Sequence, residues 1–137
     1  MPESYISEFT VKETNLDTMG HMNNAEYLKI FEQTRWDWAE LNGMGFHKIR
    51  DIGIGFVVLS IDIKFAKELH LRDKLTIKTG FIEYRKKLGI IQQTMTIGDT
   101  LYCEAQFRVG LMDLKKRQLV RPTPEFIKAF SLESFLN

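Results

Sequence analysis

The stretch DTMGHMNNA, residues 17–25, lies immediately before the longest amphipathic run of this 137-residue sequence. It contains an acid, an imidazole, two amides and a glycine. Asp and Asn are ordinary helix caps, so the simplest interpretation is a turn that begins a helix. The chemical interpretation is a carboxylate held near the unsatisfied, partly positive N–H groups of a helix N-terminus. Gly20 favours a sharp turn between the two, because glycine adopts backbone conformations that other residues resist.

The residues that follow have the spacing of a helix with one apolar face. From Asn24, core-facing positions recur at intervals of three and four residues, namely Tyr27, Leu28, Phe31, Thr34, Trp38 and Leu41. Gly43 is expected to end this helix. Residues 44–55 have no sustained period, which predicts a connection with one short helical turn.

Strands account for most of the remaining chain. Five are predicted, over residues 5–11, 57–65, 74–84, 88–97 and 101–111. The second alternates strictly, which is typical of a half-buried strand with one face made of Val57, Leu59, Ile61, Ile63 and Phe65. Gly98-Asp99 predicts a two-residue hairpin turn, and residues 124–130 predict a closing helix after the prolines that end the sheet. We therefore expect an α+β fold over residues 1–137, a single domain in which a curved antiparallel sheet of about five strands wraps one long helix.

Composition excludes several classes of function. With 19 basic and 18 acidic residues the formal charge is +1, so neither nucleic acid nor a membrane surface is an expected partner. No apolar run approaches the ~20 residues of a membrane span, and the first residues lack a signal-peptide pattern, so a cytoplasmic location is expected. The histidines are scattered without the spacing of a zinc site, so no metal is expected. Cys103 shares strand parity with Leu101, Ala105 and Phe107, which predicts a buried, unreactive thiol.

One sequence pattern resembles a known family. The pattern DxxGHxNNAxY from Asp17 to Tyr27, the helix after it and the EYRKK turn at residues 83–87 resemble the hotdog-fold thioesterases, specifically the 4-hydroxybenzoyl-CoA thioesterase-like acyl-CoA thioesterases. The resemblance implies hydrolysis of an acyl thioester, with Asp17 as a nucleophile or as a general base acting on water. It implies no metal or organic cofactor, since coenzyme A is part of the substrate. Such a likeness carries over the fold more securely than the substrate.

The residues of the motif support this chemistry independently. Hydrolysis needs a group that attacks or activates water, which Asp17 supplies, and donors for the developing oxyanion, which the N–H groups of Asn24 and Ala25 supply. His21 is expected to position the loop, the carbonyl or the water, because the nucleophile of a triad is missing. Asn23 is either a helix cap or an orienter of water. The predicted catalytic residues are Asp17, His21, Asn23 and Asn24, and the predicted substrate-binding residues are Gly20, Tyr27, Val57, Arg85, Lys86 and Lys87.

Two basic triplets, residues 85–87 and 115–117, fall at strand ends, and Arg121 follows the second. Turns of any soluble protein collect lysine, so a solvated surface is the simplest interpretation. The functional interpretation is a clamp for the phosphates of coenzyme A. The resemblance implies nucleotide contacts around EYRKK and so favours residues 85–87.

Trp36 falls on the polar side of the predicted helix, where an exposed indole is unusual. Either its own surface or a second copy of the chain covers it. Hotdog domains resemble one another in pairing through their sheets, often with sites between protomers, so the resemblance implies a homodimer or homotetramer.

Three alternatives to an acyl-CoA thioesterase stay open. The first is an acyl carrier protein thioesterase, since the plant enzymes of that kind also resemble DxxGHxNN. The second is an acyl-CoA-binding sensor, which gains little from a carboxylate placed near an anionic ligand. The third is a hotdog dehydratase, for which the sequence offers no acid–base pair suited to a 3-hydroxyacyl chain.

Overall fold

Strands and helices occur in the predicted order. The strands are β1 Tyr5–Thr10, β2 Ile54–Phe65, β3 Lys74–Arg85, β4 Leu88–Ile97, β5 Thr100–Asp113 and β6 Gln118–Val120. The α-helices are α1 Asn24–Leu41, α2 Phe46–Ile52 and α3 Pro124–Ala129, and short 3-10 helices span Glu13–Asn15 and Glu133–Phe135. This computed structural model describes residues 4–136, so the ends of the predicted domain, residues 1–3 and 137, lie outside the described residues.

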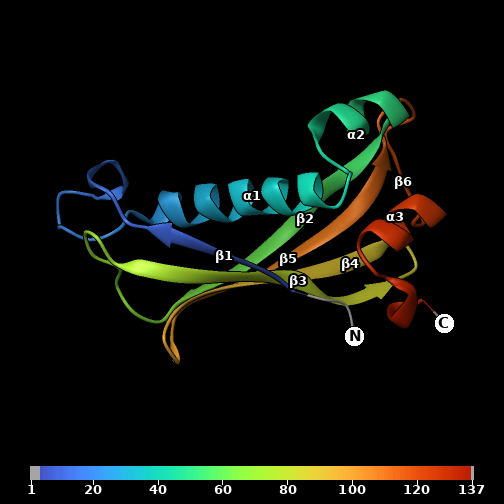
Figure 1. Ribbon diagram of the computed structural model, residues 1–137. Coiled ribbons are helices and arrows are strands. Elements are labelled where there is room, and N and C mark those ends of the chain that lie inside the picture. The colour runs from blue at the N-terminus through green and yellow to red at the C-terminus, as the bar shows by residue number, and fades with distance from the viewer. Residues whose placement is uncertain (1–3, 137) are drawn as a thin grey trace.

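Helix α1 lies across one face of a single curved antiparallel sheet (Figure 1). The strand order is β1-β3-β4-β5-β2, and β6 extends the sheet by pairing with β5. The α+β hotdog arrangement is therefore confirmed. The additional strand β6 is only three residues long, which is why no periodicity reveals it.

The buried face of α1 differs in part from the prediction. Its buried residues are Tyr27, Ile30, Phe31, Thr34 and Trp38. Leu28 is 37% exposed and Leu41 is 71% exposed, so both were wrongly assigned to the core face. Leu28 lies about 100° around the helix from Tyr27. Leu41 is the last residue of the helix.

Strand β2 also departs from its predicted alternation. Its register with β5 shifts between Val58 and Ser60, and such a shift reverses which face each following residue presents. Among residues 4–136, β2 pairs with β5 alone, so it forms an edge of the sheet. Its apolar side chains Val58, Leu59, Ile61 and Phe65 are 43% to 47% exposed. The predicted half-buried strand is thus an open, apolar edge.

The segment between α1 and β2 contains a seven-residue helix, α2, where one short turn was predicted. Near the C-terminus, α3 closes the core with an aromatic cluster in which Phe126 and Phe130 meet Phe56, and Phe130 meets Trp38 and Phe81. No helix formed by residues 4–136 is both long and apolar enough to cross a membrane.

The buried thiol is as predicted. Cys103 is fully buried together with Ala105 and Phe107, although Leu101 is 38% exposed because the β4–β5 register shifts opposite it. Burial raises the pKa of Cys103 to about 12. The thiol is therefore protonated and inert at neutral pH.

A buried polar network joins α1 to the sheet. The amide nitrogen of Gln93 donates to the carbonyl of Phe31 at 3.1 Å and to the hydroxyl of Thr79 at 3.0 Å. Arg35 Nη1 donates to Gln93 Oε1 at 2.9 Å, and its guanidinium lies 4.1 Å from the centre of the Phe107 ring. Burial lowers the pKa of Arg35. Gln93 is thus the junction that links the carbonyl of Phe31, the hydroxyl of Thr79 and the partly buried guanidinium of Arg35.

We expect Gln93→Ala to lower the free energy of unfolding by about 1–3 kcal/mol, because it leaves partners of Gln93 in the core without their hydrogen bonds. Chemical denaturation measures this. Gln106→Ala on β5, a half-buried glutamine whose side chain makes no hydrogen bond within residues 4–136, is the matched control and should change stability by less than about 0.5 kcal/mol. Equal losses in the two variants would contradict the assigned role of the network.

Candidate active site

The predicted turn before α1 is present and is closed by backbone hydrogen bonds. Asp17 N–H donates to the carbonyl of His21 at 3.0 Å, and Gly20 N–H donates to the carbonyl of Asp17 at 3.1 Å. Gly20 has a φ of +86°, a left-handed conformation that strongly favours glycine. The predicted role of Gly20 as the turning point is confirmed, and the turn sets Asp17 and His21 opposite each other.

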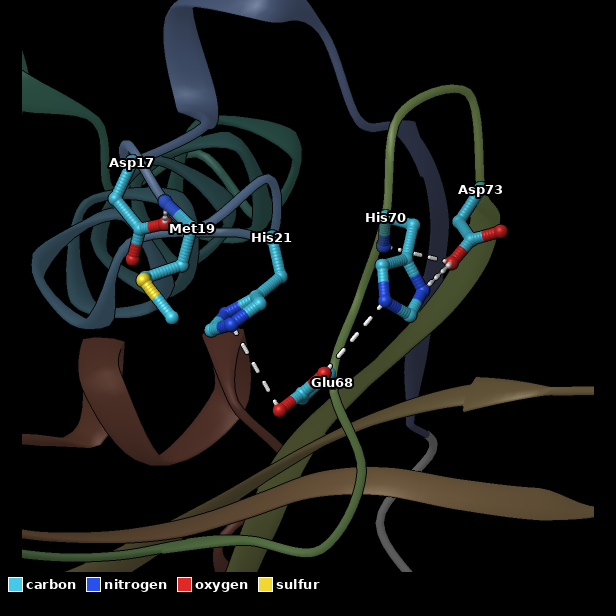
Figure 2. A network of polar contacts seen from close by, with 6 residues as sticks. All are labelled: Asp17, Met19, His21, Glu68, His70 and Asp73. Atoms are coloured by element: carbon cyan, nitrogen blue, oxygen red, sulfur yellow. Dashed lines mark hydrogen bonds and ion pairs between the residues drawn. The ribbon is translucent and has the colours of Figure 1, made fainter.

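The carboxylate of Asp17 is half-buried and only partly engaged. Its Oδ1 accepts the backbone N–H of Met19 at 2.8 Å, as Figure 2 shows. Its other oxygen receives no protein donor from residues 4–136. The turn interpretation therefore explains one oxygen and leaves the second available for chemistry.

The entrance to α1 offers fewer free donors than predicted. Asn23 is the N-cap, since its side-chain oxygen accepts the N–H of Ala25 at 2.9 Å. Its own N–H donates to the carbonyl of Asn15, which ties the cap to the preceding 3-10 helix. The N–H of Ala25 is thus occupied, whereas the N–H of Asn24 meets no protein acceptor among the described residues. Asn24 is the free donor of the predicted pair.

Two histidines that are far apart in the sequence meet beside this turn. His21 and His70 form an isolated antiparallel bridge, and their rings lie 6.4 Å apart. Glu68 lies between them (Figure 2). Histidines that are scattered in the sequence therefore meet in the fold, although within residues 4–136 no group of acidic, histidine or cysteine side chains is arranged to hold a metal ion.

Tyr27 and Val57, both predicted to bind substrate, lie in different surroundings. Tyr27 is buried in the core with its ring 4.9 Å from that of Phe65, and burial raises the pKa of its hydroxyl. Val57 lines a cavity of about 330 Å³ between the second half of α1 and β2. Other apolar walls of this cavity are Trp36, Trp38, Phe56, Val58 and Phe130. Val57 is thus placed to contact an apolar ligand, and Tyr27 packs in the core.

Residues 85–87 form the rim of a separate basic cavity of about 450 Å³. Arg108 from β5 and Arg121, which follows β6, line the same cavity. The turn itself is tight, and Lys86 has a φ of +57°. Arg108 was not predicted, because an arginine within a strand gives no sign in the sequence that it lines a cavity.

The second basic triplet lies elsewhere, in the turn between β5 and β6. Its backbone is held by Asp113, whose Oδ1 accepts the N–H groups of Lys115 and Lys116 at 3.0 Å each. These bonds lower the pKa of Asp113. All three basic side chains of this triplet are exposed and none lines the basic cavity, in agreement with a solvated surface.

The Asp17 turn and the basic cavity lie at opposite ends of strand β3. The turn is bridged to His70, shortly before β3 begins, whereas Arg85 is the last residue of β3. A strand of 12 residues spans about 36–40 Å at ~3.3 Å per residue. Within one chain, therefore, the Asp17 turn and the basic cavity do not lie together.

Sequence comparison identifies related proteins. The model of the thioesterase-like superfamily matches residues 11–130. The long-chain acyl-CoA thioesterase FadM of Escherichia coli strain K12 is 35% identical over 91 residues, which make up 66% of this chain and 68% of that protein.

Solved structures agree with the sequence comparison. The probable thioesterase YbaW of Escherichia coli is 27% identical with a TM-score of 0.81, covering 96% of this chain and 98% of that one. A Lactobacillus plantarum structure has a TM-score of 0.88 at 15% identity. The match covers 95% of this chain, which spans about half (51%) of the length of the Lactobacillus protein. The chain therefore belongs to the thioesterase-like superfamily, a family of thioester hydrolases.

Proposed function

We propose that this chain hydrolyses acyl-CoA thioesters to a free acid and coenzyme A, and that Asp17 either attacks the thioester or activates the attacking water. The observation that carries the proposal is the half-engaged carboxylate at the entrance to α1. One oxygen is fixed by Met19 N–H, and the second faces no protein donor within residues 4–136. The free N–H of Asn24 begins the adjacent helix, where partial positive charge stabilises a developing oxyanion.

Two forms of the reaction fit this arrangement. In the first, an Asp17 oxygen bonds to the acyl carbon, the C–S bond breaks, the thiolate of coenzyme A leaves, and water then cleaves the acyl–aspartyl anhydride. In the second, Asp17 takes a proton from water while the water oxygen bonds to the acyl carbon, and the C–S bond breaks with protonation of the sulfur. Neither form uses a metal or an organic cofactor, and coenzyme A enters as part of the substrate.

The apolar cavity supports an aliphatic acyl group. Its volume of about 330 Å³ falls in the range of small-molecule sites, and its walls are mostly aliphatic and aromatic. FadM is named for long-chain acyl-CoA. We therefore propose long or medium aliphatic chains as the preferred substrates.

The basic cavity supports binding of the nucleotide end of coenzyme A. The described residues that line it include the bases Arg85, Lys86, Lys87, Arg108 and Arg121 and one acid, Glu83. Arginine and lysine at such a rim bind phosphates through charge-assisted hydrogen bonds. Because this cavity is about one β3 length from Asp17, we propose that the complete site uses the Asp17 turn of one chain and the basic cavity of another.

The edge strand β2 supports pairing of two copies. A long, apolar edge strand with unpaired backbone groups is a template for adding another strand, and β2 offers 12 residues. Two identical edges that pair antiparallel generate a two-fold dimer. Trp36 lines the same cavity as Val57 and Val58 of β2, so the surface around it is continuous with this edge.

We expect Trp36→Asp to weaken assembly, because it buries an unpaired charge in a contact between copies. Trp36 is 39% exposed and its ring lies 6.1 Å from that of Phe46, which is itself 53% exposed. Sedimentation velocity across a concentration series measures the change, and circular dichroism verifies an intact fold. A dissociation constant equal to that of the parent would place Trp36 on a free surface.

The proposed activity is tested by release of coenzyme A thiol from a panel of short, medium and long aliphatic acyl-CoA, aromatic acyl-CoA and the matching acyl carrier protein thioesters. Preference for aliphatic acyl-CoA supports the proposal. Faster turnover of carrier protein thioesters favours the acyl carrier protein thioesterase instead. Tight binding of acyl-CoA without any turnover favours the sensor and contradicts hydrolysis.

A further inference from the structure

Glu68 is the acidic residue that lies between the two histidines beside the Asp17 turn. Its Oε1 lies 3.7 Å from His21 Nε2 and its Oε2 lies 3.6 Å from His70 Nε2. His70 is itself held, since its backbone N–H donates to Asp73 Oδ2 at 2.8 Å and its ring nitrogen Nδ1 lies 3.9 Å from the same oxygen. The result is a line of contacts Asp73–His70–Glu68–His21 (Figure 2), and the carbonyl of His21 accepts the N–H of Asp17.

The backbone on both sides of Glu68 is anchored, although its side chain is 63% exposed. On one side, Ala66 and Lys67 N–H groups donate to the carbonyl of Tyr102 at 2.9 and 3.2 Å. On the other, the carbonyl of the fully buried Leu69 accepts the N–H of Met22 at 2.8 Å. This last bond joins the Glu68 segment to the Asp17 turn, so the fold sets the backbone positions of Glu68 and His21 relative to each other.

We propose that Glu68 is a positioning residue for His21: its carboxylate accepts from Nε2–H of His21 and so fixes the imidazole beside Asp17. The inference rests on the proposed function, because it assigns His21 a part in hydrolysis. The present separations are slightly longer than a hydrogen bond, and contacts in unliganded active sites commonly tighten when substrate binds.

The orientation matters because imidazole has two distinct nitrogens. A carboxylate at Nε2 fixes that nitrogen as the donor and leaves Nδ1 as an acceptor that can face the attacking water. The side chain of His21 is 29% exposed, so a ring released from Glu68 has room to rotate away. Loss of orientation at the reacting atoms lowers the rate of the chemical step more than the affinity for substrate.

The test is a double-mutant cycle on acyl-CoA hydrolysis. We expect Glu68→Ala and His21→Ala each to lower kcat about tenfold with KM within about twofold of the parent. The double variant should lose no more than His21→Ala alone, because Glu68 acts through that ring. Glu68→Gln, which keeps an acceptor oxygen, should recover most of kcat. Glu13→Ala is the control, since Glu13 is a similarly exposed acid that pairs with Arg72 near the same loop.

Several outcomes overturn the inference while hydrolysis itself stands. These are a parental kcat in Glu68→Ala, a parental kcat in His21→Ala, or losses that multiply in the double variant. A Glu68→Ala variant with a lowered thermal midpoint and a Glu68→Gln variant no better than alanine would also reject it in favour of a structural role. Absence of thioester hydrolysis in the parent protein rejects both the proposed function and the positioning role.

Discussion

Asp17→Asn is expected to lower kcat on an acyl-CoA substrate by about 10²- to 10⁴-fold, the usual contribution of a positioned base. The amide keeps the shape and still accepts the Met19 N–H that closes the turn, so the fold and substrate binding should survive. It removes the nucleophilic oxygen and the proton acceptor together. Initial rates of thiol release and a binding titration measure the two effects separately.

Asp99→Asn is the matched control for this change, because Asp99 is an exposed aspartate in the hairpin turn between β4 and β5. It should retain parental kcat. If Asp17→Asn also turns over at the parental rate, then Asp17 is only a turn residue and its proposed catalytic role is wrong.

Isotope labelling separates the two forms of the reaction. A single turnover in ¹⁸O-water transfers label into Asp17 if an acyl–aspartyl anhydride forms and water attacks its aspartyl carbon. Label that appears only in the released acid indicates either a general base or attack of water at the acyl carbon of the anhydride. Trapping the anhydride with hydroxylamine during turnover then distinguishes these two.

Replacing Arg85, Lys86 and Lys87 together by alanine is expected to raise KM for acyl-CoA roughly 10- to 100-fold with little change in kcat. Contacts to the phosphates are similar in the ground state and the transition state, so they contribute to binding and not to the chemical step. Added salt should raise KM of the parent in the same direction and have a smaller effect on the variant.

The second triplet provides a control of identical charge. Lys115, Lys116 and Arg117 are exposed in a turn and lie outside the basic cavity, so their triple alanine variant should keep parental KM. A rise in KM of equal size in both triple variants would show that net charge alone attracts the substrate, and that residues 85–87 form no specific clamp.

The local parts of the fold and of the site were predictable from the sequence. The Asp17 turn depends on Gly20 and on hydrogen bonds within residues 15–23, and α1 depends on residues three and four positions apart. Both signals lie within a short window. The order of the predicted elements, together with the resemblance to the hotdog-fold thioesterases, predicted the α+β arrangement.

The parts that depend on distant contacts were not predictable in the same way. Glu68 and His70 reach the site only through the bridge between His21 and His70, and Arg108 joins residues 85–87 only through the pairing of β4 with β5. The register shift in β2 opposite Val109 and Arg108 leaves no mark on the alternation of its sequence. Sequence periodicity describes one element at a time, so it does not report which elements meet.

The central claim is that each site combines Asp17 of one chain with the basic cavity of another, and subunit complementation tests it most directly. Asp17→Asn and the triple alanine variant at residues 85–87 are differently tagged, co-expressed and purified as a mixed dimer. A two-chain site leaves one of the two sites intact, so the mixed dimer should show about half the parental kcat at the parental KM, although neither variant alone does. A mixed dimer whose KM is as high as that of the triple variant would contradict the two-chain site.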